Sequence, residues 1–152
     1  AVWRDPMRYV SMLERFGCVL TPDYSVYIDM PEPIQRYNAY RGRAVGKLWQ
    51  DAGLIVVPTL TWGEPNTYDW CFEGLPKNAT VALSTVGLMK DKGGVDLFRA
   101  GANEAMKRLE PSIVLAYGKQ CDFDARGAYV VWYESDMNKR FNDLKEKRKR
   151  ER

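Results

Sequence analysis

Two carboxylates, Asp23 and Glu64, are the residues of this sequence that are best placed to do chemistry. Each follows a stretch predicted to be a strand, Asp23 in TPDYS and Glu64 in the corner TLTWGEPNTYDW. Facing each other across a cleft, they could act as a general acid and a general base. They could equally hold a divalent cation through their oxygens. No spacing in the sequence makes either role specific, so no cofactor and no metal ligand is assigned, and a divalent cation stays an open alternative.

Further side chains are predicted to bind a ligand because they follow predicted strands, lie on the predicted helix 31–53, or belong to the same corner. They are Tyr24, Arg41, Arg43, Trp62, Tyr68, Ser84, Thr85 and Lys119. The alternative is that these residues only satisfy turns and helix caps, as polar residues after strands commonly do. Both interpretations remain open at the level of sequence.

The absence of histidine restricts the chemistry that this chain can perform alone. A Ser-His-Asp or Cys-His mechanism is excluded, and the commonest metal ligand is missing. The three cysteines are scattered without a CxxC pair, which argues against a zinc site. Their odd number and apolar neighbours predict reduced thiols in a cytoplasmic protein. Cys18 and Cys71 are expected in the core, and Cys121 is expected to be exposed.

The elements that would position these residues alternate between helix and strand. Helices are predicted at 4–17, 31–53, 66–75 and 95–109, and strands at 18–21, 54–60, 80–87, 112–118 and 128–134. This alternation predicts an α/β domain over 1–138, with a mainly parallel five-stranded open sheet or partial barrel and flanking helices. Because the last connection is short, the fifth strand is expected to be an antiparallel edge. The carboxyl ends of parallel strands lie at the same edge of a sheet, so the predicted site residues that follow the strands would meet there.

Helix 31–53 has an apolar stripe that is expected to face the core, formed by Ile34, Tyr37, Val45, Leu48 and Trp49. It also carries a basic and aromatic face formed by Arg36, Tyr40, Arg43 and Lys47. Such a face can contact phosphates and stack on bases, although a solvated face with its aliphatic stems over the core is the simpler interpretation. Within this helix, GRAVGK is not a phosphate-binding loop. It has three residues between its glycines instead of four, Leu48 follows the lysine, and no strand precedes it.

The net charge of +3 conceals a strongly basic end. Residues 139–152 hold eight Lys/Arg and three Asp/Glu, whereas the other 138 residues hold 15 and 17. Residues 139–152 are therefore predicted to be a basic helical extension. It is either a frayed soluble helix end or an arm that contacts nucleic acid or an acidic protein partner. The contacting residues would be Lys139, Arg140, Lys145, Lys147, Arg148, Lys149 and Arg150.

Several stretches together resemble the bacterial and phage domain of unknown function numbered 4417. The resemblance rests on TPDYSVYIDMP, YRGRAVGKLW, PTLTWGEPNTYD, FEGLP and VALSTVG, and it covers roughly residues 3–120. It implies a setting in phages and other mobile elements and no established activity. It also implies a set of motif residues, namely Asp23, Tyr24, Asp29, Arg41, Arg43, Trp62, Glu64, Tyr68, Glu73, Ser84 and Thr85.

The function predicted from these features is that of a non-enzymatic phage or mobile-element accessory protein. It would bind nucleic acid or a host nucleoprotein complex, as a replication accessory or a counter-defence factor. The alternatives are a carboxylate-based or metal-assisted enzyme acting on a nucleotide or phosphoester, and an assembly protein. No apolar run reaches the ~18–20 residues that cross a bilayer, so no membrane partner and a cytoplasmic location in a bacterial host are expected. The oligomeric state is left open.

Overall fold

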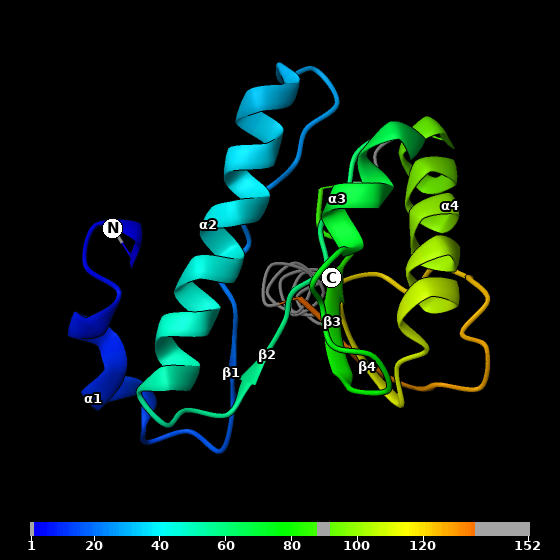
Figure 1. Ribbon diagram of the computed structural model, residues 1–152. Helices are drawn as coiled ribbons and strands as arrows, with labels where there is room; N and C mark the ends of the chain where they lie inside the picture. The colour runs from blue at the N-terminus through cyan, green and yellow to red at the C-terminus, as the bar shows by residue number, and fades with distance from the viewer. Residues whose placement is uncertain (1, 88–91, 136–152) are drawn as a thin grey trace, which may run out of the picture.

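The computed structural model describes residues 2–87 and 92–135 as a mixture of helices and parallel strands (Figure 1). The strands are β1 (Val19–Leu20), β2 (Val56–Val57), β3 (Thr80–Ser84), β4 (Ile113–Tyr117) and β5 (Tyr129–Tyr133). Every pairing between them is parallel. The predicted α/β class is therefore confirmed. The predicted antiparallel edge is wrong, because β5 runs parallel to β4 with Tyr133 opposite Tyr117.

The strands form two sheets, β1–β2 and β3–β4–β5, and not the single sheet that was predicted. The interruption lies at Pro58, which has no N–H to donate to a ladder. Beyond it, Thr59 makes an isolated parallel bridge to Ala82. The Ala82 N–H donates to the Pro58 carbonyl at 2.9 Å, and the Leu60 N–H donates to the Ala82 carbonyl at 2.7 Å. The two sheets are thus neighbours, and the strands lie side by side in the order of the sequence.

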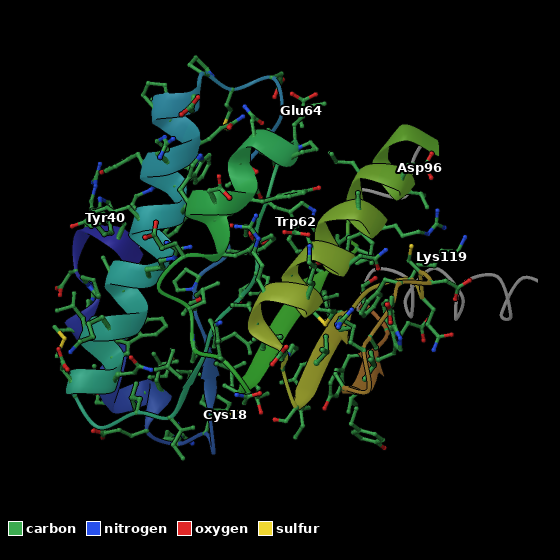
Figure 2. The ribbon with its side chains drawn as sticks, turned by 45° about the vertical axis from the view of Figure 1, so that its right-hand side comes forward. Cys18, Tyr40, Trp62, Glu64, Asp96 and Lys119 are labelled. Atoms are coloured by element: carbon green, nitrogen blue, oxygen red, sulfur yellow. The ribbon has the colours of Figure 1, made fainter. Side chains whose placement is uncertain are left out.

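Helix α4 (Lys92–Leu109) covers one face of the three-stranded sheet (Figure 2). Its apolar residues recur at helical spacing and are almost fully buried, namely Phe98, Ala102, Ala105, Met106 and Leu109. They belong to one core cluster with Val81, Leu83, Val114 and Ala116 of the sheet and with residues of α3 (Tyr68–Phe72). The helix predicted at 95–109 is confirmed, and it begins three residues earlier.

Helix α2 (Glu32–Asp51) confirms the prediction at 31–53, but its buried face differs in part from the expected one. Val45 and Trp49 are buried as expected. Three residues of the predicted apolar stripe are instead exposed, namely Ile34, Tyr37 and Leu48. The polar side chains of Gln35 and Asn38 take buried positions.

These two buried amides tie the loop after β1 to the helix. The Gln35 amide donates to the carbonyls of Tyr27 at 2.7 Å and Met30 at 3.1 Å. The Asn38 amide donates to the carbonyl of Ser25 at 2.8 Å. Because buried polar groups need partners, these bonds explain how polar residues can occupy the inner face of α2.

The glycines of GRAVGK allow α2 to approach the end of β1 closely. A Cβ on Gly46 would lie 2.6 Å from Cγ2 of Thr21, and one on Gly42 would lie 3.2 Å from the carbonyl oxygen of Pro22. The motif therefore serves helix packing, which agrees with its rejection as a phosphate-binding loop.

The single helix predicted at 4–17 is wrong. The segment forms η1 (Val2–Arg4), η2 (Met7–Tyr9) and the four-residue helix α1 (Val10–Leu13). Its apolar residues are spaced by three, and each such step drifts about 60° around an α-helix, so they do not share a face. Phe16, the last of them, is 62% exposed. Over residues 2–87 and 92–135, no helix has both the length and the apolar composition needed to span a bilayer.

Candidate functional site

Three of the predicted strand ends meet around a cavity of about 250 Å³, the strand-end cleft. The segments after β1, β2 and β3 supply its polar lining, and Leu97 and Phe98 of α4 close one side. The polar lining residues are Asp23, Ser25, Tyr27, Thr61, Trp62 and Ser84. Parallel strands thus bring Asp23, Trp62 and Ser84 together, as the sequence predicted.

Asp23 is the one charged side chain among the described residues that line the cleft. The residue is exposed, yet neighbouring protein atoms displace part of the water around its carboxylate, and this partial burial raises its pKa. Within residues 2–87 and 92–135, no hydrogen bond or ion pair to this carboxylate is found. Among the described residues, no group therefore replaces the water that neighbouring atoms have displaced from the carboxylate.

Trp62 forms a fixed wall of the cleft (Figure 2). Its ring centroid lies 5.6 Å from that of Phe98 and 6.0 Å from that of Phe72, and its Nε1–H points to the Leu97 carbonyl at 3.4 Å. On α4, a Cβ at Gly101 would lie only 2.0 Å from the indole Nε1, so the helix backbone itself holds the ring in place.

Ser84 contributes a hydroxyl at the end of β3. Its Oγ accepts a hydrogen bond of 3.2 Å from the Val86 N–H. A serine hydroxyl has a further acceptor position and a donor, so it can still bond to a ligand in the cleft.

Glu64 does not line this cavity. It is exposed ahead of η3 (Pro65–Thr67), where its carbonyl accepts hydrogen bonds from the N–H and the hydroxyl of Thr67 at 2.9 and 2.8 Å (Figure 2). Glu64 does not line the α2–α3 groove described below either, so the two carboxylates share neither of these cavities, and their pairing as acid and base, or around a cation, stays a prediction.

Tyr68, Thr85 and Lys119 also lie outside the lining of the cleft. Tyr68 is buried and stacks on Phe72, and burial raises its pKa. Its hydroxyl has no hydrogen-bond partner among the described residues. The Thr85 hydroxyl is buried and donates to the Lys119 carbonyl at 2.8 Å. The Lys119 side chain is exposed on the side of α4 away from Tyr40 (Figure 2). Ligand-binding roles for these three residues stay predictions.

A second cavity of about 220 Å³, the α2–α3 groove, opens between α2, the loop after α3 and the ends of β1 and β2. Its lining includes Tyr24, Arg43, Lys47, Thr59, Thr61 and Cys71. Among the described lining residues there is no Asp or Glu, so the groove is electropositive. The sequence predicted Tyr24 and Arg43 as ligand-binding residues, and the structure brings both to this groove.

Arg43 connects α2 to the end of α3. Its guanidinium donates to the carbonyls of Trp70, at 2.9 Å, and Cys71. A cation is favourable at a helix C-terminus, where carbonyls have no helical partners. Burial lowers the pKa of Arg43, and the negative charge of Glu73 opposes that effect.

Arg41 packs between aromatic rings instead of lining either cavity. Its guanidinium carbon lies 4.1 Å from the Tyr24 ring centroid and 5.0 Å from that of Tyr37, and it donates to the Asn38 side chain. Its Nε is buried and has no hydrogen-bond partner within residues 2–87 and 92–135. A ligand-binding role for Arg41 stays a prediction.

Two of the three expectations for cysteine are wrong. Cys18 is exposed, because it precedes β1 at the end of the molecule opposite Glu64 (Figure 2). Cys121 is buried, because the loop before β5 folds it into the core cluster of α4. Cys71 is buried as expected, and burial raises the pKa of its thiol to about 11.

The residues predicted to form a nucleic-acid arm, Lys139, Arg140, Lys145, Lys147, Arg148, Lys149 and Arg150, lie outside the described residues. The sequence did not single out Ser25, Tyr27, Thr61, Leu97 or Phe98 as lining residues. The alternation of Ser25 and Tyr27 around the buried Val26 is the signal of an extended segment that could have indicated the first two.

Comparison with known proteins agrees with the resemblance seen in the sequence. The chain is 41% identical over 122 residues to the "Gene 1 protein" of Mycobacterium phage L5, covering 79% of this chain and 53% of that protein. It is 43% identical over 123 residues to the "Gene 1 protein" of Mycobacterium phage D29, covering 80% and 46%. The chain thus spans about half the length of these relatives. No solved structure matches it.

The family comparison covers nearly all of the described residues. It extends over residues 1–134, which is further than the segment 3–120 that carried the resemblance. The described strand-end cleft and α2–α3 groove both lie within this range. The chain therefore belongs to the family described as Domain of unknown function (DUF4417).

Proposed function

We propose that this chain is a phage accessory protein that binds nucleic acid, alone or within a host nucleoprotein complex, through the α2–α3 groove and its rim. The observation that carries the proposal is the charge of the groove. Arg43 and Lys47 line it, and no acidic side chain is found among its described lining residues. Phosphates supply most of the affinity of proteins for nucleic acid, and they need such a surface.

Side chains at the rim of the groove could bind a flexible single strand of nucleic acid. Tyr40 precedes Lys47 on the same edge of α2. Its ring contacts Trp3 and Tyr37, but the residue is 59% exposed, so a base can stack on the part that is free. Arg36, further along this edge, lies over the Trp70 ring at 4.9 Å. Lys47 pairs with Asp51, but both side chains are exposed, and exposed ion pairs are weak enough to be exchanged for a phosphate contact.

Two observations outside the groove support this function. The relatives named "Gene 1 protein" are phage proteins, which supports a phage setting for this chain. Residues 139–152 hold eight Lys/Arg against three Asp/Glu and would add phosphate contacts. The chain spans about half the length of those relatives, so nucleic-acid binding by a full-length protein of this family is likewise part of the proposal.

The test is a fluorescence-polarization titration of the full chain with labelled single-stranded DNA, RNA and duplex DNA between about 50 and 200 mM salt. We expect Lys47→Glu to weaken binding and to flatten the salt dependence by about 0.7 to 0.9 for each phosphate that the variant no longer neutralises. Tyr40→Ala should weaken binding to single strands by about 1–3 kcal/mol for each unstacked base, with little effect on duplex.

Lys107→Glu is the matched control. Lys107 is as exposed as Lys47, 68% against 67%, and it also pairs with an acid of its own helix, but it does not line the groove. A third variant of the full chain has glutamine at the basic positions from 145 to 150. It measures how much of the binding affinity comes from the basic extension, residues 139–152. Binding that is negligible, or that Lys47→Glu and Lys107→Glu reduce equally, would refute the groove as the contact surface.

A further inference from the structure

We propose that the strand-end cleft binds a small organic cation, an ammonium or guanidinium compound with an apolar body. Its charge would lie against the carboxylate of Asp23, and its apolar body against Trp62 and Phe98. This site is distinct from the α2–α3 groove, and the inference does not depend on nucleic-acid binding.

The charge of the cleft is the first argument. Asp23 is the one charged side chain among the described lining residues, and it has neither a cationic partner nor a hydrogen bond within the described part of the chain. Its burial disfavours the ionised form. A ligand cation would replace the favourable interactions with water that burial takes from the carboxylate, whereas a phosphate would be repelled.

The polar lining fits the hydrogen-bond pattern of such a cation. Ammonium and guanidinium groups donate several hydrogen bonds and accept none. Besides the carboxylate, the cleft offers hydroxyl oxygens as acceptors, on Ser25, Tyr27, Thr61 and Ser84. The cationic side chains of the neighbouring concavity, Arg43 and Lys47, do not line it.

The apolar wall supplies the second half of the site. Trp62 is held by Phe72, Phe98 and the backbone at Gly101, so little side-chain freedom is given up when a ligand packs against it. An aromatic ring within about 6 Å of a cation also attracts it directly. The cavity volume of about 250 Å³ equals that of about eight water molecules, which suits a short alkyl amine.

The test compares putrescine and agmatine with 1,4-butanediol, a neutral molecule of the same length as putrescine, by calorimetric titration of the full chain at constant ionic strength. We expect saturable binding of at least one of the two cations and none of the diol. Asp23→Asn should weaken that binding at least tenfold. Asp29→Asn is the matched control, since Asp29 lies in the same loop, is exposed and does not line the cleft.

A second readout is independent of any variant. In two-dimensional NMR of the full chain, the indole N–H signal of Trp62 should shift and saturate with the bound cation, while that of Trp49, in the other core cluster, should not. No saturable binding of either cation, equal binding of the diol, or equal affinity in wild type and Asp23→Asn would overturn the proposal. Nucleic-acid binding measured on Asp23→Asn stays unchanged in either case, so failure of this site is distinguishable from failure of the groove.

Discussion

At the scale of single residues, Asp23 is an exposed residue whose carboxylate lines the strand-end cleft. Its carboxylate is partly desolvated by its neighbours and has no compensating partner among the described residues. A carboxylate in such a position destabilises the folded state when it is ionised, and the proposed bound cation would offset that cost.

The first prediction concerns the stability of Asp23→Asn. The pKa of Asp23 is raised in the folded state, so the folded protein holds this proton more tightly than the unfolded chain does. Ionised Asp23 therefore lowers the free energy of unfolding at pH 7, and Asp23→Asn should raise it. The difference should disappear near pH 3, where the carboxyl is protonated in both states. Urea unfolding of both proteins at the two pH values measures this, and a less stable variant at pH 7 would contradict it.

The second prediction concerns the thiols. Cys18 is exposed, whereas Cys71 and Cys121 are buried, and the raised pKa of Cys71, about 11, keeps its thiol protonated at neutral pH. We expect a thiol reagent to label one cysteine quickly in the native protein and all three after unfolding. Cys18→Ser should abolish the fast phase. Fast labelling of two thiols would show that a buried site is accessible.

At the scale of elements, side-chain bonds replace the strand ladder where Pro58 interrupts it. The Thr59 N–H donates to Oγ1 of Thr21, and the Thr59 hydroxyl donates to the Thr21 carbonyl, both at 2.8 Å. Two threonines thus connect β1 to the segment that pairs with β3, so the two sheets stay joined in spite of the proline.

The third prediction tests this junction. Thr21→Val keeps the volume of the side chain but leaves the Thr59 N–H without its acceptor, which should cost about 1–3 kcal/mol in the free energy of unfolding. Thr80→Val is the control, because no hydrogen bond of the Thr80 side chain is found in the described part of the chain. Chemical denaturation of both variants measures the difference. Equal costs would mean that the Thr21 hydroxyl is not needed at the junction.

The fourth prediction concerns the contact between α4 and Trp62. Alanine is the better helix former, by about 1 kcal/mol over glycine. A methyl group at position 101, however, would lie 2.0 Å from the indole Nε1. We expect Gly101→Ala to destabilise the protein by about 1–3 kcal/mol and to change the tryptophan fluorescence, because the ring must move. A stabilised variant with an unchanged spectrum would contradict the packing described here.

The sequence could predict those elements whose apolar pattern is regular. β3, β4 and β5 lie within continuous apolar runs, and α4 repeats its apolar residues at helical spacing. The segment 2–17 could not be predicted, because a spacing of three does not build one face of an α-helix.

The candidate site was predictable only in part, for a physical reason. Parallel strands fix where a segment leaves the sheet, so the meeting of Asp23, Trp62 and Ser84 followed from topology. The path of the chain beyond that point depends on tertiary bonds such as those from Gln35 and Asn38 to the loop after β1. No sequence period encodes such bonds. Nor does any sequence period show that Glu64, two residues beyond Trp62, lies outside the cleft.

At the scale of the whole molecule, the described residues form two core clusters of unequal size. The larger lies between α3, α4 and the three-stranded sheet. The smaller contains the buried residues Val19, Val45 and Trp49 beneath the N-terminal segment, where the Trp49 Nε1–H donates to the Pro6 carbonyl at 2.9 Å. Buried apolar area is the main source of stability, so the smaller cluster is the weaker part of the fold.

The fifth prediction follows from this inequality. Amides of β3 and β4 should exchange with solvent only through global unfolding, whereas those of Val19 and Thr21, which bond to Ile55 and Val57, should exchange through a smaller opening of lower free energy. Native-state hydrogen exchange at low denaturant concentrations measures both. A single free energy for all these amides would show that the two clusters unfold as one unit.

Thr61 belongs to the walls of both the strand-end cleft and the α2–α3 groove. The two cavities are therefore separated at this point by the thickness of one residue. If an occupant of one cavity displaces Thr61, it reshapes the other, and thermodynamic linkage makes the resulting change in affinity reciprocal. Binding of an anion in the groove would then change the affinity of the cleft for a cation, and binding of the cation would change the affinity for the anion.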